Sequence, residues 1–144
     1  MHLSRRDMTM LFPLLAARAG AQGQGQGNET LPSKVYRPAQ FPFTGDEKKK
    51  GRRYFHGVNH SRFTLDVHET ALGPGVQTHT PHRHVYEEII VILEGTVEAF
   101  IEGKTEPAEP GSVLYFGSNQ LHTMRNIGTA PCLYCAIELR GDVA

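Results

Sequence analysis

Two histidines stand one residue apart just before five aliphatic residues, in segment 82–95 (HRHVYEEIIVILEG). In an extended strand the side chains at i and i+2 lie on one face, so His82 and His84 point the same way, and counting on by twos adds Glu88. Imidazoles and a carboxylate are costly inside an apolar core unless something occupies their lone pairs, which a divalent transition metal does well. The spacing therefore predicts a metal site inside the fold.

Two features of this segment leave alternatives open. A turn between residues 84 and 88 would break the parity, and a helix would also align His84 with Glu88. A single inward histidine is more often a hydrogen-bonded core residue than a ligand. Three groups of ligand type within seven residues, followed by β-branched residues and a glycine turn, favour the strand and the metal.

His122 is the candidate for a fourth ligand, because it follows the turn-like residues 117–120 (GSNQ) and would lie on a neighbouring strand. Three nitrogen ligands and one oxygen ligand leave about two positions free on an octahedral ion. Free positions are typical of a catalytic or substrate-binding metal rather than a sealed structural one. These donors do not distinguish Fe, Mn, Ni, Co and Zn.

Other side chains are candidates for the surroundings of this site. Tyr86 shares the inward parity and is expected to fill the interior or to donate a hydrogen bond near the metal. His79 has the opposite parity and is a candidate for the mouth of the pocket. Tyr115 and Phe116 are expected to wall the cavity from the two sides of their strand. Three further histidines are expected in loops or on the surface: His56, His60 and His68.

Cys132 and Cys135 have the C-xx-C spacing that redox and zinc sites use. In an extended strand these positions lie ~10 Å apart on opposite faces, beyond the ~7 Å that a disulfide spans. Only a bulge would bring the two thiols together, so neither a disulfide nor a zinc site is expected here.

Short strands must position these residues. Apolar and polar residues alternate in 63–67 and 97–101, whereas 89–93 is apolar on both faces. Glycines at 95, 103 and 111 stand in turn-like settings between such runs, and no stretch after residue 30 has a convincing helical period. Even spacing of this kind predicts an all-β domain, an antiparallel sandwich or barrel, over residues 58–140.

The N-terminal segment 1–21 has the pattern of an export signal. Arg5 and Arg6 precede a short apolar stretch, and residues 19–21 (AGA) fit a small-x-small cleavage site. Residues 4–7 (SRRD) resemble a twin-arginine signal, so we expect delivery to a bacterial periplasm. The alternative is a tail with accidental arginines and a cytoplasmic protein. The apolar stretch is too short for stable membrane insertion, which needs about 20 residues.

Segment 22–30 is expected to be a flexible linker, and 31–57 an extended, proline-rich arm and loop that includes a solvated basic cluster at 48–53 (KKKGRR). The chain of 144 residues has room for one domain. Its 15 basic and 15 acidic residues give no reason to expect nucleic acid as a partner.

Two motifs resemble those of the cupin superfamily. The first, two histidines, a glutamate and a glycine, is here His82-x-His84-xxx-Glu88-(x6)-Gly95. The second is here Gly111-(x5)-Gly117-x-Asn119-xx-His122-xxx-Asn126. Gly117 stands where proline is usual, and Asn119 where glycine is usual. Since asparagine tolerates the left-handed conformation of glycine, we expect the turn to be kept.

The resemblance implies an antiparallel double-stranded β-helix, or jelly-roll barrel, with one metal inside on His82, His84, Glu88 and His122. It also implies an enzyme, dioxygenase-like or isomerase/lyase-like, acting on a small oxygen-rich organic substrate, with Glu88 doubling as general base. The alternative is a non-catalytic cupin that binds a small molecule or a sugar. Because cupins often pair through their sheets, we expect a homodimer.

Overall fold

The computed structural model describes residues 30–141, so the expected signal segment 1–21 and most of the expected linker lie outside the described residues. One short 3-10 helix, η1 (Pro38–Gln40), precedes the sheets. The strands are β1 (Thr44–Gly45), β2 (Lys49–Val58), β3 (Thr64–Leu72), β4 (Glu87–Glu94), β5 (Val97–Ile101), β6 (Lys104–Ala108), β7 (Val113–Phe116), β8 (His122–Asn126) and β9 (Cys132–Arg140).

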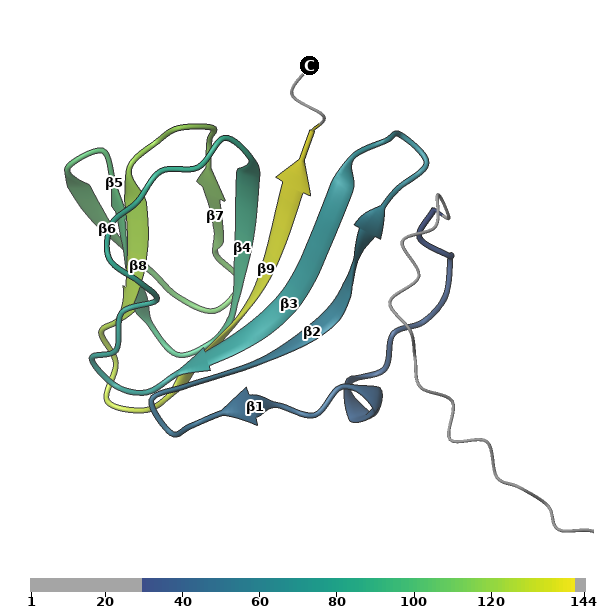
Figure 1. Cartoon of the computed structure of the whole chain (residues 1–144). Coiled ribbons are helices and arrows are strands. Elements are labelled where there is room, and N and C mark those ends of the chain that lie inside the picture. Colours follow the sequence, from purple (N-terminus) through teal and green to yellow (C-terminus); the bar gives the residue numbers. More distant parts are fainter. Residues whose placement is uncertain (1–29, 142–144) are drawn as a thin grey trace, which may run out of the picture.

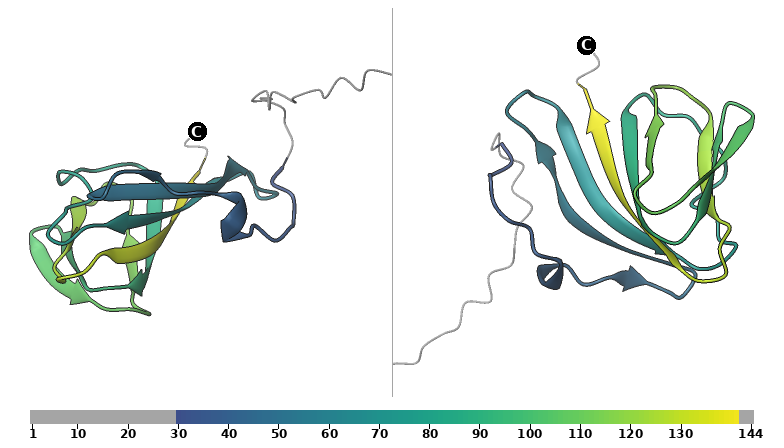
Figure 2. Two further views of the ribbon diagram at one scale, coloured as in Figure 1. Left: turned by 90° about the horizontal axis from the view of Figure 1, so that it is seen from below. Right: turned by 180° about the vertical axis from the view of Figure 1, so that it is seen from behind.

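These strands form two antiparallel sheets. The larger sheet has the order β1-β2-β3-β9-β4-β7, and the smaller one the order β6-β5-β8. The three-stranded sheet lies opposite β4 and β7, whereas β3 and β2 extend beyond it (Figures 1 and 2). The predicted all-β jelly-roll fold is confirmed. No helix within residues 30–141 is long and apolar enough to cross a membrane.

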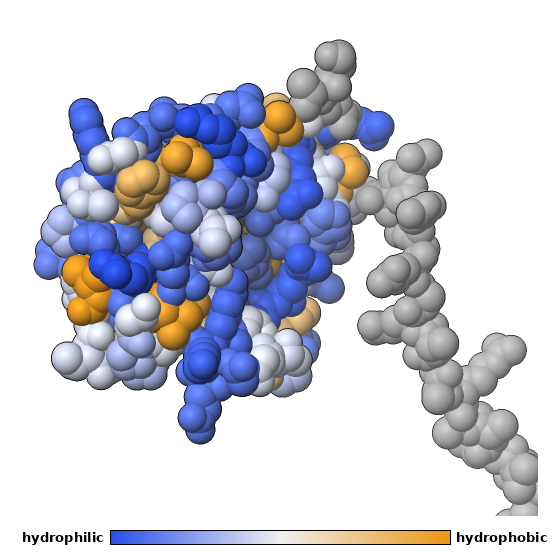
Figure 3. All heavy atoms as spheres, turned by 60° about the vertical axis from the view of Figure 1, so that its left-hand side comes forward, coloured by the Kyte–Doolittle hydropathy of each residue, from blue (hydrophilic) through white to orange (hydrophobic). Residues whose placement is uncertain are grey.

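The core lies between the two sheets. Alternate residues of β3, β4 and β9 face inward, so apolar side chains of both sheets meet there. The buried side chains of the larger sheet include Leu72, Ile90, Ile92, Leu114, Tyr134 and Ala136, and those of the smaller sheet Val97, Ala99 and Met124. The outer side of the molecule that carries the smaller sheet is hydrophilic over most of its area, with small separate apolar patches (Figure 3).

The turns between strands follow the glycines. Glu102 and Gly103 both have positive φ (46° and 84°) and connect β5 to β6, as a two-residue hairpin turn requires. Gly95 has φ of 80°, and a Cβ there would lie 2.7 Å from Cβ of Cys132. Asn119 has φ of 60°, so the turn before β8 keeps the left-handed conformation that we expected asparagine to tolerate.

Residues 49–58 form a strand, although we expected them in an arm and loop. β2 pairs with β3 from Lys49 opposite Leu72 to Val58 opposite Thr64, with a bulge between Arg53 and Phe55. The basic cluster 48–53 is therefore mostly strand rather than solvated loop. The polar composition of this cluster gave no strand pattern in the sequence. Pairing with β3 and packing on one face decide strand formation here more than local propensity does.

The inward face of β3 also differs from the alternation in 63–67. Phe63 is 44% exposed, and Asp66, only 2% exposed, faces inward in line with Leu72. Leu65 and Val67 lie on the opposite, outer face, where they are half-buried. The apolar residues of this alternation therefore lie on the outer face, because the inner face of β3 is polar at Asp66 and His68.

The arm before β1 covers the outer face of β2. The ring centroids of Tyr36 and Phe55 lie 4.7 Å apart, and those of Phe41 and Tyr54 lie 5.4 Å apart. This packing leaves the inner, concave face of β2 and β3 uncovered by the arm.

Candidate metal centre

Three elements bring the predicted ligands together. Glu88 is the second residue of β4 and faces inward, as its parity predicts. His122 begins β8. The strand that we expected at His82 and His84 starts only at Glu87, so both histidines lie in the segment before it. That segment is fixed by an isolated bridge, in which the backbone N–H of His82 donates to the carbonyl of His122 (3.2 Å) and the N–H of His122 donates to the carbonyl of His82 (3.0 Å).

Backbone carbonyls set the tautomers of two rings. Nδ1 of His84 donates to the carbonyl of Tyr86 (2.7 Å), and Nδ1 of His122 donates to the carbonyl of Gln120 (2.9 Å). A carbonyl only accepts, so Nδ1 carries a proton in each ring, and in the neutral ring Nε2 has the lone pair. Oε2 of Glu88 lies 3.7 Å from Nε2 of His84 and 3.4 Å from Nε2 of His122.

Unpaired ring nitrogens therefore converge at this point. Nε2 of His122 and Nδ1 of His82 are buried and have no hydrogen-bond partner within the described residues. One ligand atom from each of His82, His84 and His122 lies within 4.8 Å of the others. Two atoms bound to one transition metal at about 2.1 Å each lie at most about 4.2 Å apart, so a small ring movement suffices. The residues fit a metal ion.

Electrostatics at the centre also favour a cation. Burial, and then the proximity of His122, lowers the pKa of His82, which keeps that ring neutral and able to donate a lone pair. Burial raises the pKa of Glu88, and the carboxylate of Glu138, directly opposite on the neighbouring strand β9, raises that pKa further. A bound divalent cation would remove this penalty on ionised Glu88.

Aromatic rings hold the ligands in place. Tyr86 stacks on His84 with centroids 3.7 Å apart, and Phe116 stacks on His122 at 4.2 Å. Tyr115, which we expected to wall the cavity, instead faces outward. It is 54% exposed, and its hydroxyl donates to Oε1 of Glu87 (2.7 Å). Strand alternation on β7 explains this, because Leu114 and Phe116 take the inward positions.

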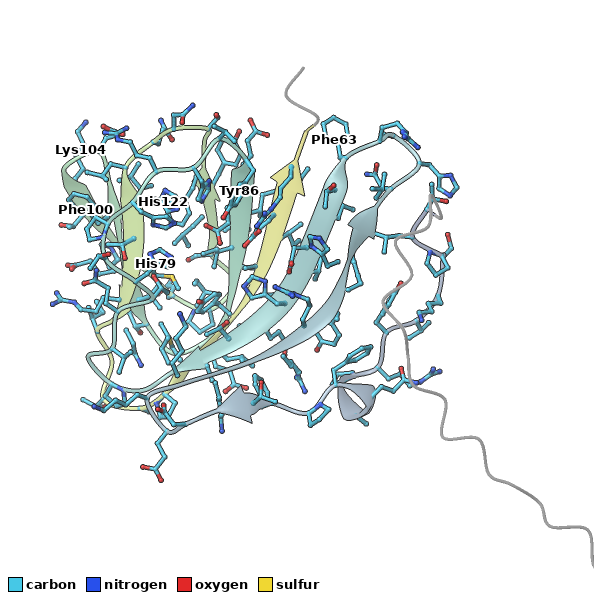
Figure 4. The ribbon with its side chains drawn as sticks, in the orientation of Figure 1. Phe63, His79, Tyr86, Phe100, Lys104 and His122 are labelled. Atoms are coloured by element: carbon cyan, nitrogen blue, oxygen red, sulfur yellow. The ribbon has the colours of Figure 1, made fainter. Side chains whose placement is uncertain are left out.

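His79 lies at the edge of the centre. Its ring centroid is 4.0 Å from that of His82 and 6.3 Å from that of His122 (Figure 4). Burial, and then the proximity of His82, lowers the pKa of His79 from 6.5 to about 4. The ring is exposed on its other side, as expected for a residue at a pocket mouth.

The two cysteines stay apart. Both Cys132 and Cys135 are free thiols, the first buried in the core and the second on the other face of β9. No bulge within 132–135 joins them.

The sequence alone missed a second group of polar residues on the inner face of the larger sheet. His56 lies opposite Asp66, Asp66 opposite Glu138, and Glu138 opposite Glu88. We call these four residues the polar row. The signal that could have found it is the polar parity of Asp66, His68 and Thr70 in β3.

The family model for the Cupin domain matches residues 68–138. Among solved structures, the fold is similar to KdgF from Halomonas sp., with 15% identity, a TM-score of 0.64, and coverage of 77% of this chain and 97% of that one. It is also similar to a predicted oxalate decarboxylase from Thermotoga maritima, with 20% identity, a TM-score of 0.61, and coverage of 74% and 99%. A sugar phosphate isomerase from Silicibacter pomeroyi shares 19% identity at a TM-score of 0.55, covering 64% and 59%. No curated protein sequence matches the chain.

Proposed function

Because the chain belongs to the cupin superfamily, we propose that it is a metal-dependent enzyme acting on a small, oxygen-rich organic molecule. One divalent transition metal would be held by His82, His84, Glu88 and His122. One observation carries this proposal: Oε2 of Glu88 lies 3.4 and 3.7 Å from two imidazole nitrogens that carry lone pairs. Such an arrangement is unfavourable unless a cation occupies the space between these atoms.

A bound metal would supply Lewis acidity that polarises a carbonyl or hydroxyl oxygen of the substrate. The chain supplies the rest. Carbonyls of Tyr86 and Gln120 fix the two ring orientations, and such outer partners tune metal ligands. The carboxylate of Glu88 faces the centre and would take a proton from a substrate carbon or hydroxyl when it swings off the metal.

This chemistry favours an isomerase- or lyase-type reaction. Proton transfer by a carboxylate beside a Lewis acid needs no further oxidant. The names of two structural neighbours, an isomerase and a predicted decarboxylase, support the same class.

The metal is tested by elemental analysis of protein purified without a chelating tag. We expect about one transition-metal ion per chain in the wild type and less than about 0.2 in His122→Ala. His60→Ala is the matched control, because His60 is exposed and lies in the turn before β3. Equal metal content in the wild type and His122→Ala would exclude this centre.

Catalysis is tested separately with Glu88→Gln. We expect this variant to keep a measurable fraction of the metal and to lose turnover of sugars, sugar phosphates, hydroxy acids, diketones, catechols and flavonols followed by NMR. Metal-loaded wild-type protein that alters no member of this panel would favour a binding protein over an enzyme.

A further inference from the structure

The polar row continues the metal centre across the concave face of the larger sheet. Residues directly opposite each other in neighbouring strands share a face, so His56, Asp66 and Glu138 lie on the same face as Glu88. Arg53 lies opposite His68 in the next row. The ribbons of β2 and β3, which carry His56, Arg53, Asp66 and His68, extend beyond the three-stranded sheet (Figure 1).

Asp66 organises one end of this face. Its side chain is only 3% exposed and accepts hydrogen bonds from Nδ1 of His56 (3.1 Å), Nδ1 of His68 (3.1 Å) and Nε of Arg53 (3.3 Å). A carboxylate only accepts, so Nδ1 carries a proton in both rings, and in each neutral ring Nε2 keeps a lone pair. The side chains of His56 and His68 are 49% and 25% exposed. The result is two oriented hydrogen-bond acceptors that solvent can reach.

Arg140 organises the end nearer the metal centre. Its Nε and Nη2 donate to Oε2 of Glu138 (3.2 and 2.5 Å), and its guanidinium lies 4.3 Å from the ring centroid of Tyr86. Tyr86 in turn stacks on His84, so the ring of Tyr86 lies between Arg140 and a proposed metal ligand. A guanidinium has five N–H donors. Among the guanidinium nitrogens of Arg140, only Nε and Nη2 donate hydrogen bonds within the described residues. Its side chain is 44% exposed.

The charges on this face balance, but the hydrogen bonds do not. Arg53 and Arg140 neutralise Asp66 and Glu138, which a structural network would also do. A structural network leaves no reason for two cationic side chains to keep free donors beside two imidazoles with free acceptors. Donors for a carboxylate and acceptors for hydroxyls, side by side, are complementary to a hydroxylated acid.

We propose that this face is a substrate-recognition strip, formed by Arg53, His56, His68 and Arg140, and that it selects a small polyhydroxy carboxylate. Arg140 binds the carboxylate, and Nε2 of His56 and of His68 accept hydrogen bonds from hydroxyls. The other end of the substrate reaches the metal centre. This inference rests on the proposed function, because it assigns a substrate class to that centre.

The strip is tested by calorimetric titration of the purified protein with D-gluconate and with D-glucitol. These probes have the same carbon chain, and only gluconate has a carboxylate. We expect gluconate to bind at least about tenfold more tightly than glucitol. Arg140→Gln should weaken gluconate binding about tenfold without changing metal content, and Arg53→Gln, at a side chain that is 65% exposed, should act in the same direction.

Arg125→Gln is the matched control, because Arg125 is 51% exposed and paired with Glu98 on the smaller sheet. It should leave gluconate binding unchanged. Equal affinity of the wild type for the two probes, no binding of gluconate, or unchanged binding in both Arg140→Gln and Arg53→Gln would overturn the strip.

The same measurements separate the strip from the metal centre. A gluconate preference that Arg140→Gln removes, in protein that holds no metal, would support the strip and end the proposed function. Protein that holds one metal ion yet binds the two probes equally would contradict the proposed recognition strip and would still agree with the proposed metal centre.

Discussion

At the scale of single residues, hydrogen-bond direction says more about the centre than proximity does. Three histidines near a glutamate would be an ordinary polar cluster if each ring donated to the carboxylate. Here the Nδ1–H groups of His84 and His122 donate to backbone carbonyls. The Nε2 atom of each ring therefore faces the carboxylate of Glu88. The sequence predicts the residue types but not this tautomer choice, because the two carbonyls come from Tyr86 and Gln120 and depend on local backbone geometry.

His79 gives a pH dependence at this scale. Its pKa in the folded protein is lowered from 6.5 to about 4, so the unfolded chain binds the extra proton between these values. Stability should therefore fall as the pH drops from 6.5 towards 4, and part of this loss should disappear in His79→Gln. The measurement is urea unfolding of metal-free protein at pH 7 and pH 4.5. His60→Gln, at an exposed histidine, is the control, and an identical loss in His79→Gln and wild type would contradict the assignment.

At the scale of elements, the sequence predicts strands where one inner face is apolar. The inward parity of Glu88 follows from Ile90 and Ile92, which share its face and are 3% and 1% exposed. The strand β2 (Lys49–Val58) was not predicted, and the inward face of 63–67 was not assigned, for one reason. Both line the polar part of the concave face, where Asp66 replaces a core residue, so hydrophobic alternation carries no signal there.

Asn126, the last residue of the second motif, is structural rather than catalytic. It is 0% exposed, its Nδ2 donates to the carbonyls of Leu72, Gly73 and Ala130, and its Oδ1 accepts from the backbone N–H of Gly128. Its side chain therefore ties the end of β8 to the ends of two loops.

Asn126→Ala should lower the free energy of unfolding by about 2–4 kcal/mol, because it leaves buried carbonyls without donors. Urea unfolding measures this change. Asn59→Ala, which removes one surface hydrogen bond to the N–H of Phe63, should cost less than about 1 kcal/mol. Similar losses in the two variants would show that the network does not hold the loops.

At the scale of the whole molecule, the residues of the candidate metal centre come from both sheets. Glu88 belongs to the larger sheet, His122 to the smaller one, and His82 and His84 to the segment that connects β3 to β4. A metal bound by all four would link the segment 82–88 to His122, which is distant in sequence and belongs to the other sheet. Apolar packing of the core side chains also joins the sheets, and the sequence predicts this packing from composition and alternation.

Metal should therefore raise global stability. At a free metal concentration about 100 times the Kd, the free energy of unfolding should rise by about 2.7 kcal/mol, and a chelator should reverse this. Urea unfolding with and without EDTA measures the difference. In His122→Ala the difference should vanish, and a full metal effect in that variant would show that the ion binds elsewhere.

The stacking of Tyr86 on His84 has a practical consequence. The chain contains five tyrosines and no tryptophan, so its ultraviolet emission comes from phenol rings alone. One of these rings lies 3.7 Å, centroid to centroid, from an imidazole of the metal centre. Occupancy by an open-shell ion would quench that ring, which gives the protein an intrinsic optical reporter of its own loading.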